Sequence, residues 1–296
     1  MSATLRMLAA AAIVVAFAGA RSWGAAAPGA SATLPEVTIA SRRAELQPKV
    51  SKFVSQIAAR DAQGLPRWMQ KVCPQVTGLP KQEGEFMLER LTEIAGAAGV
   101  GLAGEQCRPN LFIFVTAKPE ALLGAMQERK ALAVGDATAS DVSEFIATQR
   151  PVRVWYNCMV SSGAPGQGAN VAEPNTANMG TAPTYNSFDQ PTHLLVTSVR
   201  TFASVFVIID QTRLHAVSRG QLADYVGMVA LAELKPSVHV EEGQSILKLF
   251  DGAAQAAPAG MSEWDQAFLK SLYASEPRSK QQREQIASTM VREIVH

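Results

Sequence analysis

The feature that most constrains the fold of this chain is an unbroken apolar segment followed closely by a capped helix. Residues 204–210 read Ser-Val-Phe-Val-Ile-Ile-Asp, a run without polar alternation that is typical of a strand buried on both faces. After a polar turn, Ser218 and Gln221 have the spacing of a capping box, in which two side chains satisfy N–H groups of the first helical turn. Apolar residues then recur at helical spacing as far as Leu234. This strand and helix are predicted to form the centre of the core.

The N-terminus predicts export. Arg6 precedes a short apolar segment at residues 7–18, and small residues follow it, as in a secretory signal peptide. The segment is too short to span a bilayer comfortably, and no cysteine follows it for lipid attachment. We expect a signal peptide at residues 1–27, cleaved near Ala20 or Ala26. The mature protein is then expected to be periplasmic or secreted, with no membrane anchor.

The charge balance argues against two classes of partner. Residues 1–27 include Arg6 and Arg21 but no acidic residue, so the rest of the chain keeps 25 of the 27 basic residues and all 26 acidic ones. A mature charge near zero offers neither a basic surface for nucleic acid nor a polybasic segment for anionic lipid. The expected partner is instead a periplasmic protein or a small ligand.

If the chain is exported to an oxidising compartment, two of its cysteines are expected to form a disulfide. Cys73 and Cys107 flank one predicted helix and are the expected disulfide, which would stabilise the fold by roughly 3 kcal/mol. Cys158 lies in an apolar strand and is predicted to be a buried thiol. Its segment offers neither a histidine nor a helix N-terminus, the features that activate a catalytic cysteine.

The residue pattern divides the mature chain into three parts. A flexible leader is expected at residues 28–43, an N-terminal α/β part at 44–150 and a C-terminal α+β part at 151–296. The N-terminal part alternates helices with strands, which is typical of helices packed on a sheet. Its clearest elements are expected at residues 44–60, 80–100, 119–129 and 141–149 for helices and 111–116 for a strand.

The C-terminal part places strands first and helices last. Strands are expected at residues 152–160, 194–200 and 204–210. Only Thr201-Phe202-Ala203 separates the last two, which suggests a tight antiparallel pair. Helices follow to the end of the chain. The predicted fold class is α+β, a mixed sheet with helices packed on it and a helical C-terminus.

The segment at residues 161–192 is long and rich in Gly, Pro, Asn and Ser. Such a segment either covers a cleft or is a low-complexity insertion, and its composition fits both. Its glycines at 163–168 do not form a phosphate-binding loop, because Pro165 removes an N–H group and no lysine is present.

The order of segments from residue 204 onward resembles that of a known family. The helix begins Gln-Leu-Ala-Asp-Tyr, and it is followed by Ser-Ile-Leu-Lys-Leu-Phe at 245–250 and Met-Ser-Glu-Trp-Asp at 261–265. This layout resembles the C-terminal part of an uncharacterised family of exported proteobacterial proteins, which is similar to the DUF2927 group of secreted, zincin-like peptidase candidates. The resemblance implies a zincin-like fold in which helix 219–234 packs under a site cleft.

The chain departs from that group at the metal site. A zinc peptidase of this class needs two histidines one turn apart on a helix, with a glutamate between them as base. The only histidines are His193, His215, His239 and His296; no two are three or four residues apart. The helix at 219–234 contains none. We therefore predict no metal ligands and no cofactor, and the sequence disfavours a working metallopeptidase.

Asp210, His215 and Glu233 are the candidate catalytic residues if the chain is an enzyme. Asp210 could orient His215, but no Gly-x-Ser-x-Gly elbow supplies a nucleophile. A carboxylate in this position more often forms a turn or caps a helix, and His215 is expected to be solvated. Glu233 could be a buried acid with a raised pKa, or it pairs with Lys235 or a nearby arginine.

Four arginines fall in or beside predicted strands. They could line an anion-binding cleft, and exposed arginines at a sheet edge would give the same pattern. These residues are Arg150, Arg153, Arg200 and Arg213.

Two functional hypotheses follow. The favoured one is a non-catalytic, zincin-like exported domain that binds a partner or ligand. The alternative is a periplasmic hydrolase or peptidase with a non-standard site, built from Asp210, His215 or Glu233 beneath the segment at 161–192.

Overall fold

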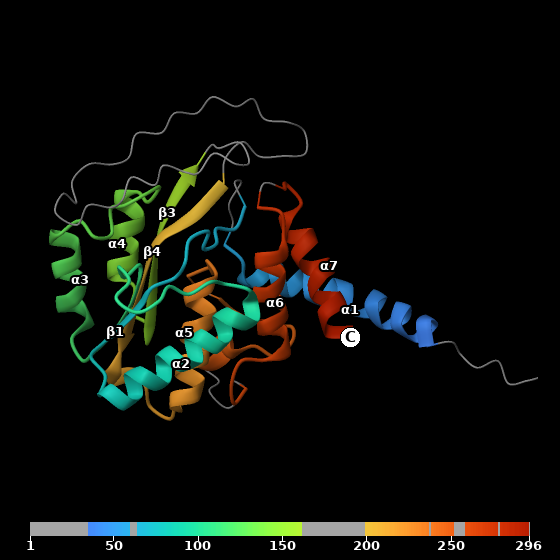
Figure 1. Ribbon diagram of the computed structural model, residues 1–296, viewed down its shortest axis with the longest axis horizontal. Coiled ribbons are helices and arrows are strands. Elements are labelled where there is room, and N and C mark those ends of the chain that lie inside the picture. Colours follow the sequence, from blue (N-terminus) through green and yellow to red (C-terminus); the bar gives the residue numbers. More distant parts are fainter. Residues whose placement is uncertain are drawn as a thin grey trace, which may run out of the picture.

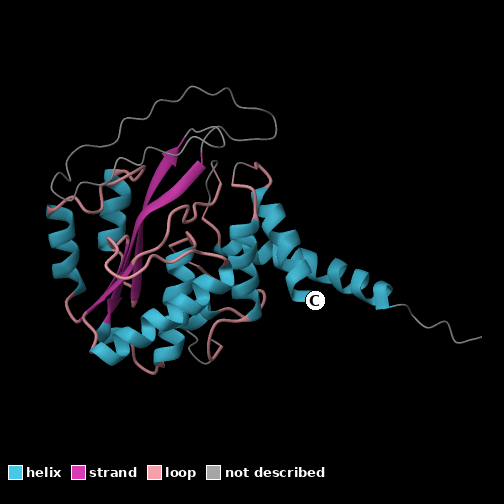
Figure 2. Ribbon diagram, in the orientation of Figure 1, coloured by secondary structure: helices cyan, strands magenta, loops and turns pink. Residues whose placement is uncertain are grey.

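A computed structural model describes residues 35–59, 64–161, 199–236, 238–251, 258–277 and 279–295. Within these residues four strands form one sheet, and helices cover both of its faces (Figure 2). The strands are β1 (Pro74–Thr77), β2 (Leu111–Thr116), β3 (Val152–Ser161) and β4 (Val199–Asp210). The α-helices are α1 (Pro35–Ile57), α2 (Lys81–Ala98), α3 (Pro119–Glu128), α4 (Ala139–Ala147), α5 (Arg219–Leu231), α6 (Glu263–Ala274) and α7 (Gln282–Val295). Two short 3₁₀ helices are η1 (Gln211–Arg213) and η2 (Ile246–Phe250).

The sheet is mixed and has the strand order β1-β2-β4-β3. The first three strands in this order are parallel, with Leu111 opposite Val205 and Thr116 opposite Asp210. Strand β3 is antiparallel to β4 and forms one edge of the sheet. The predicted α+β class, a mixed sheet with packed helices and a helical C-terminus, is confirmed.

The helices form a layer on each face of the sheet. Figure 1 shows α3 and α4 beside one face, where a small apolar cluster includes Leu123, Trp155 and Ile208. The other face carries the larger core, in which α2 and α5 pack together over Val205 and Val207. Beyond them, α7 packs against α6 and α1. None of the helices within the described ranges is long and apolar enough to cross a membrane.

The predicted central unit is confirmed. Strand β4 contains the buried residues Val205, Val207 and Ile209, and α5 begins at the predicted cap. The Ser218 hydroxyl accepts the Gln221 N–H at 3.2 Å, and the Ser218 N–H donates to the Gln221 side chain at 3.1 Å. Most residues of α5 are buried, because the sheet, α2 and η2 surround it.

The prediction of a turn at Thr201-Phe202-Ala203, joining two antiparallel strands, is wrong for the residues that the structure describes. These residues lie inside β4, which runs without a turn from Val199 to Asp210. No Gly, Pro or Asn occurs there to form a turn, and Phe202 is buried in the core. The antiparallel partner of β4 is β3, with a bulge at Asn157 and Cys158.

The N-terminal boundary also needs correction. The leader expected at residues 28–43 is helical from Pro35, because α1 begins there rather than at residue 44. Proline is favoured in the first helical turn, where an N–H group has no partner in any case. The signal peptide at 1–27, the cleavage positions Ala20 and Ala26, and residues 162–192 lie outside the described residues.

The two parts expected at 44–150 and 151–296 share one sheet. Strands β1 and β2 come from the first part and β3 and β4 from the second, so a single core joins them. The predicted disulfide between Cys73 and Cys107 is confirmed, with Cα atoms 6.0 Å apart at the two ends of the segment that contains α2. Cys158 is buried in β3.

Candidate functional site

A groove of about 700 Å³ runs along β3, the edge strand. One wall is a face of α4 that carries Glu144, Phe145 and Thr148. The other wall consists of Tyr225 and Val229 of α5, together with lining residues from 233–239 and 247–251. The groove therefore lies where, among the described residues, the sheet has no further strand.

The register of β3 shows which main-chain groups face the groove. The Asp210 N–H donates to the Pro151 carbonyl at 2.8 Å, so these two residues form a hydrogen-bonded pair. In an antiparallel ladder such pairs alternate with pairs whose N–H and C=O groups point outward. The alternation turns the main-chain groups of Val152, Val154 and Tyr156 away from β4, and all three residues line the groove. We call these outward N–H and C=O groups the open edge.

The open edge has a defined end on each side. At one end β3 begins at Val152, shortly after α4 ends at Ala147. At the other end, the Cys158 carbonyl accepts the Asp136 N–H at 3.2 Å. Gly135 permits this contact, because it has φ of +88° and a Cβ atom there would lie 1.9 Å from the Cys158 carbonyl oxygen. The open edge is therefore limited to Val152–Tyr156.

A buried charge network lies beside the Tyr156 end of the open edge. Arg200 of β4 donates to Asp136 at 2.7 Å and to Glu233, just beyond α5, at 2.8 Å. Burial acts to lower the pKa of Arg200, but the carboxylates, Glu233 above all, outweigh it and raise that pKa. Two carboxylates therefore share the guanidinium of Arg200 at this end of the groove, which Lys235 also lines.

Tyr156 is held in place by the end of α5. Its hydroxyl donates to the carbonyls of Val229 and Ala232 at 2.8 and 3.0 Å. Burial and the charge of Glu233 raise the pKa of Tyr156 well above its usual range. The hydroxyl is therefore a neutral donor that satisfies carbonyls at the helix end, and it anchors the edge strand to α5.

The opposite end of the groove carries different groups. Arg150 lies just before β3, and its charge acts on the Tyr225 hydroxyl. The Tyr225 ring packs edge-on against Phe250 with centroids 4.8 Å apart. His239 Nδ1 lies 2.5 Å from a carboxylate oxygen of Asp251. This end combines an apolar pocket with a guanidinium and a histidine–aspartate pair.

The predicted catalytic residues occupy separate places. Glu233 lines the groove and pairs with Arg200, as the arginine-pairing alternative stated. Asp210 is buried at the end of β4, where it accepts the Thr212 N–H at 3.0 Å and caps η1. His215 is exposed in the turn that follows η1. Neither Asp210 nor His215 lines the groove, so the groove does not unite the three.

Three of the four arginines singled out from the sequence line the groove. They are Arg150, Arg153 and Arg200, whereas Arg213 pairs with Asp210 outside it. The sequence analysis missed the His239–Asp251 pair and Tyr225. A histidine and an aspartate twelve positions apart give no local signal, because only the chain path brings them together.

The described residues contain no group of three or more His, Cys, Asp or Glu side chains that could hold a metal ion. His215 and His239 are both exposed within that part of the chain, whereas His193 and His296 lie outside it. The lining of the groove instead offers main-chain donors and acceptors, apolar side chains and charges.

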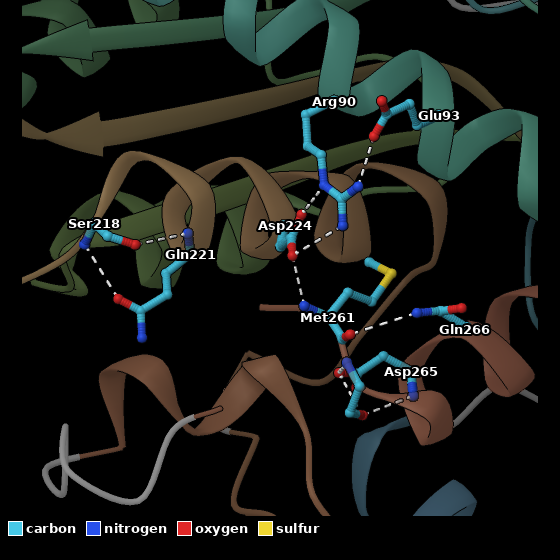
Figure 3. A network of polar contacts seen from close by, with 9 residues as sticks. Arg90, Glu93, Ser218, Gln221, Asp224, Met261, Asp265 and Gln266 are labelled. Atoms are coloured by element: carbon cyan, nitrogen blue, oxygen red, sulfur yellow. Dashed lines mark hydrogen bonds and ion pairs between the residues drawn. The ribbon is translucent and has the colours of Figure 1, made fainter. Parts of the chain in front are cut away.

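A second arginine–carboxylate cluster lies away from the groove (Figure 3). Asp224 of α5 accepts hydrogen bonds at 2.5 Å from Arg90 of α2 and from the Met261 N–H. The bond to Asp224 is the main cause of the raised pKa of Arg90, although burial opposes it. Every polar group of Asp224 thus has a partner that joins α5 to α2 and to the start of α6. This cluster is a structural link.

Comparisons with protein-family models, with curated proteins and with solved structures found no match. The class of the protein therefore rests on its own fold and groove. It is a disulfide-containing α+β domain with a groove along an antiparallel edge strand.

Proposed function

We propose that this chain is an exported, non-catalytic binding protein that holds an extended segment of a partner protein against β3. The observation that carries the proposal is the open edge of Val152, Val154 and Tyr156 facing a groove of about 700 Å³. An extended peptide can add a strand to such an edge, with main-chain hydrogen bonds supplying affinity and pockets supplying specificity.

The cellular location is part of the proposal. The Cys73–Cys107 disulfide supports it, because structural disulfides persist mainly in oxidising compartments. Residues 1–27 supply the signal that would direct the chain to the periplasm or out of the cell. The relation to the zincin-like group belongs to the same proposal, and it would make this chain a member that kept a peptide-sized groove without histidines on α5.

The state of the groove side chains favours binding over catalysis. Glu233 and Asp136 are both engaged by Arg200, so neither is available as an unpaired base. Tyr156 donates to two carbonyls, and its raised pKa keeps it neutral. General-base catalysis needs a group with a pKa near the working pH within reach of a substrate proton.

One observation favours the alternative, a periplasmic hydrolase. His239 and Asp251 line the groove and have the pairing by which a carboxylate orients a catalytic imidazole. If this pair acts as a base, His239→Ala should abolish hydrolysis of peptides that bind the groove. Intact peptides after prolonged incubation with the unaltered protein would exclude this function.

The binding proposal predicts an alternating pattern of amide hydrogen exchange along β3. The N–H groups of Arg153 and Trp155 face β4 and should exchange slowly, whereas those of Val152, Val154 and Tyr156 should exchange fast. Addition of a library of N-acetylated random pentapeptides should slow the second set. Protection elsewhere, with these three amides unchanged, would contradict the proposal.

A pair of variants distinguishes the contribution of the Val154 N–H to peptide binding from that of the Val154 side chain. Val154→Pro removes the outward N–H and keeps the bonds to β4, because proline is tolerated on a strand edge when its missing N–H faces away from the sheet. Val154→Ala keeps the N–H and shortens the side chain. We expect Val154→Pro to weaken peptide binding about tenfold, and Val154→Ala to weaken it less. Equal affinities for both variants, with unchanged melting temperatures, would count against strand addition.

A further inference from the structure

The two ends of the groove carry different charged groups. At the Tyr156 end, Asp136 and Glu233 share the single guanidinium of Arg200. At the Val152 end lies Arg150. A bound chain therefore has two carboxylates beside one end of the open edge and the guanidinium of Arg150 beside the other, which favours one direction of binding.

Arg150 differs from the other cations of the groove. Arg153 pairs with Glu120 at 3.3 Å, Arg200 has its two carboxylates, and Lys235 donates to the Ser55 carbonyl. Within the described ranges no carboxylate forms an ion pair with Arg150, which is only partly exposed. A guanidinium in a groove that forms no such ion pair is suited to a carboxylate ligand, which it can bind through two parallel hydrogen bonds.

The direction of β3 relates this charge to the polarity of a bound chain. A strand that pairs antiparallel to β3 runs from Tyr156 toward Val152, so its carboxyl end reaches the start of β3 next to Arg150. Strand β3 begins at Val152, so a chain that follows the open edge in this direction reaches the end of the strand there. A chain that ends there loses no edge bonds.

The side chain at such an end would lie in the apolar pocket. Residues directly opposite each other in an antiparallel pair project to the same face of the sheet. Val154 and Tyr156 project to the face covered by α5, where Tyr225, Phe250 and Val238 belong to the same apolar cluster. A terminal residue in this position is best accommodated if its side chain is apolar.

We propose that the ligand of this groove is the free carboxyl terminus of a partner protein, bound antiparallel to β3 with its carboxylate on Arg150 and an apolar last residue beside Tyr225. The inference rests on the proposed function, because it requires an extended chain on the open edge. The inference adds the direction in which the bound chain runs along β3, the carboxylate at its end and the residue, Arg150, that recognises this carboxylate.

The test uses two matched libraries of N-acetylated random pentapeptides, one with free carboxylates and one with carboxamides. Each is incubated with the mature chain, and bound peptides are identified by mass spectrometry. The best binder is then made in both forms for calorimetry against the unaltered protein, Arg150→Gln and Arg129→Gln. Arg129 is exposed at the end of α3 and does not line the groove, so it controls for loss of one charge.

The free acid should bind roughly ten- to a hundredfold more tightly than the amide, as expected for hydrogen bonds between charged groups. Arg150→Gln should remove this difference, Arg150→Lys should restore part of it, and Arg129→Gln should leave it intact. Thermal melts of each variant show whether a loss of binding is a loss of folding.

Other results would overturn the inference in distinguishable ways. Equal binding of acid and amide, still weakened by Val154→Pro, would refute the terminal carboxylate and leave strand addition standing. Selection of amidated peptides with an internal Asp or Glu, sensitive to Arg150→Gln, would assign Arg150 to a side chain instead. Absence of any binder in both libraries would refute this inference together with the proposed function.

Discussion

Two arginine–carboxylate clusters lie along α5, and they differ in what surrounds them. Arg90 and Asp224 join α2 to α5, with the Asp224 side chain 4% exposed and also bonded to the Met261 N–H. Arg200 and Glu233 join β4 to the segment after α5, and both line the groove. A cavity of about 110 Å³ borders the first cluster, whereas the groove of about 700 Å³ borders the second.

This contrast shows why a buried ion pair is not in itself a functional site. Both clusters shift the pKa of their arginine upward through a carboxylate. What marks the second as part of a site is the combination of space, unpaired main-chain groups on β3 and a guanidinium, Arg150, at the far end. The Arg90–Asp224 cluster borders only the smaller of these two cavities and contributes no residue to the groove.

The largest expected effect concerns the disulfide, which joins the two ends of the segment that contains α2. The Cys73→Ser, Cys107→Ser double variant should lower the free energy of unfolding by about 3–4 kcal/mol, because the unfolded chain regains the freedom of a long loop. Urea denaturation measures this cost. At temperatures where the variant is folded, the exchange pattern of β3 should be unchanged, since α2 does not line the groove. A changed pattern would show that the two regions are coupled.

The next prediction compares the two carboxylates directly. Asp224→Asn should lower the free energy of unfolding by about 3 kcal/mol. The amide has only one acceptor oxygen, so it cannot accept from both Arg90 and the Met261 N–H as the two carboxylate oxygens do. Glu233→Gln should cost only about 1 kcal/mol, because Arg200 keeps Asp136 and water can enter the groove. Chemical denaturation of both variants measures the two losses of unfolding free energy and tests this difference. Glu93→Gln is the control, since this exposed partner of Arg90 should cost less than about 0.5 kcal/mol. Equal costs for Asp224→Asn and Glu233→Gln would remove the distinction between structural and site clusters.

The smallest effect is a pH dependence at the Arg150 end. Burial raises the pKa of Tyr225 to about 12, and the charge of Arg150 opposes the rise. A phenol whose pKa is higher in the folded state contributes stability that is present below its unfolded pKa of about 10 and is lost as pH rises toward 12. Phenolate absorbance of the unaltered protein and of Tyr225→Phe measures this titration. Arg150→Gln should raise the Tyr225 pKa further; a fall would place Arg150 away from the hydroxyl.

The elements of this protein were predictable where their signals are local. Helix α5 begins at the Ser218–Gln221 capping box, and α2 ends at Gly99 in the left-handed conformation that glycine favours. The apolar segment at 111–116 became β2, and Cys73 and Cys107 paired as expected. The error at Thr201–Ala203 arose because a short gap between two apolar runs was taken for a turn, although it contained no turn residue.

The sequence by itself determined the strand and helix segments, the capping residues, the disulfide partners and the lack of paired histidines, because each depends on residue type and spacing along the chain. The tertiary structure alone decided that β3 is an edge strand, that Val152, Val154 and Tyr156 turn their main chain outward, and that Arg150 and Glu233 lie at the groove. These features depend on strand order and register. Contacts between residues 33 to 76 positions apart, such as Arg200–Glu233 and Tyr156–Ala232, follow from packing of the whole chain, which local patterns do not encode.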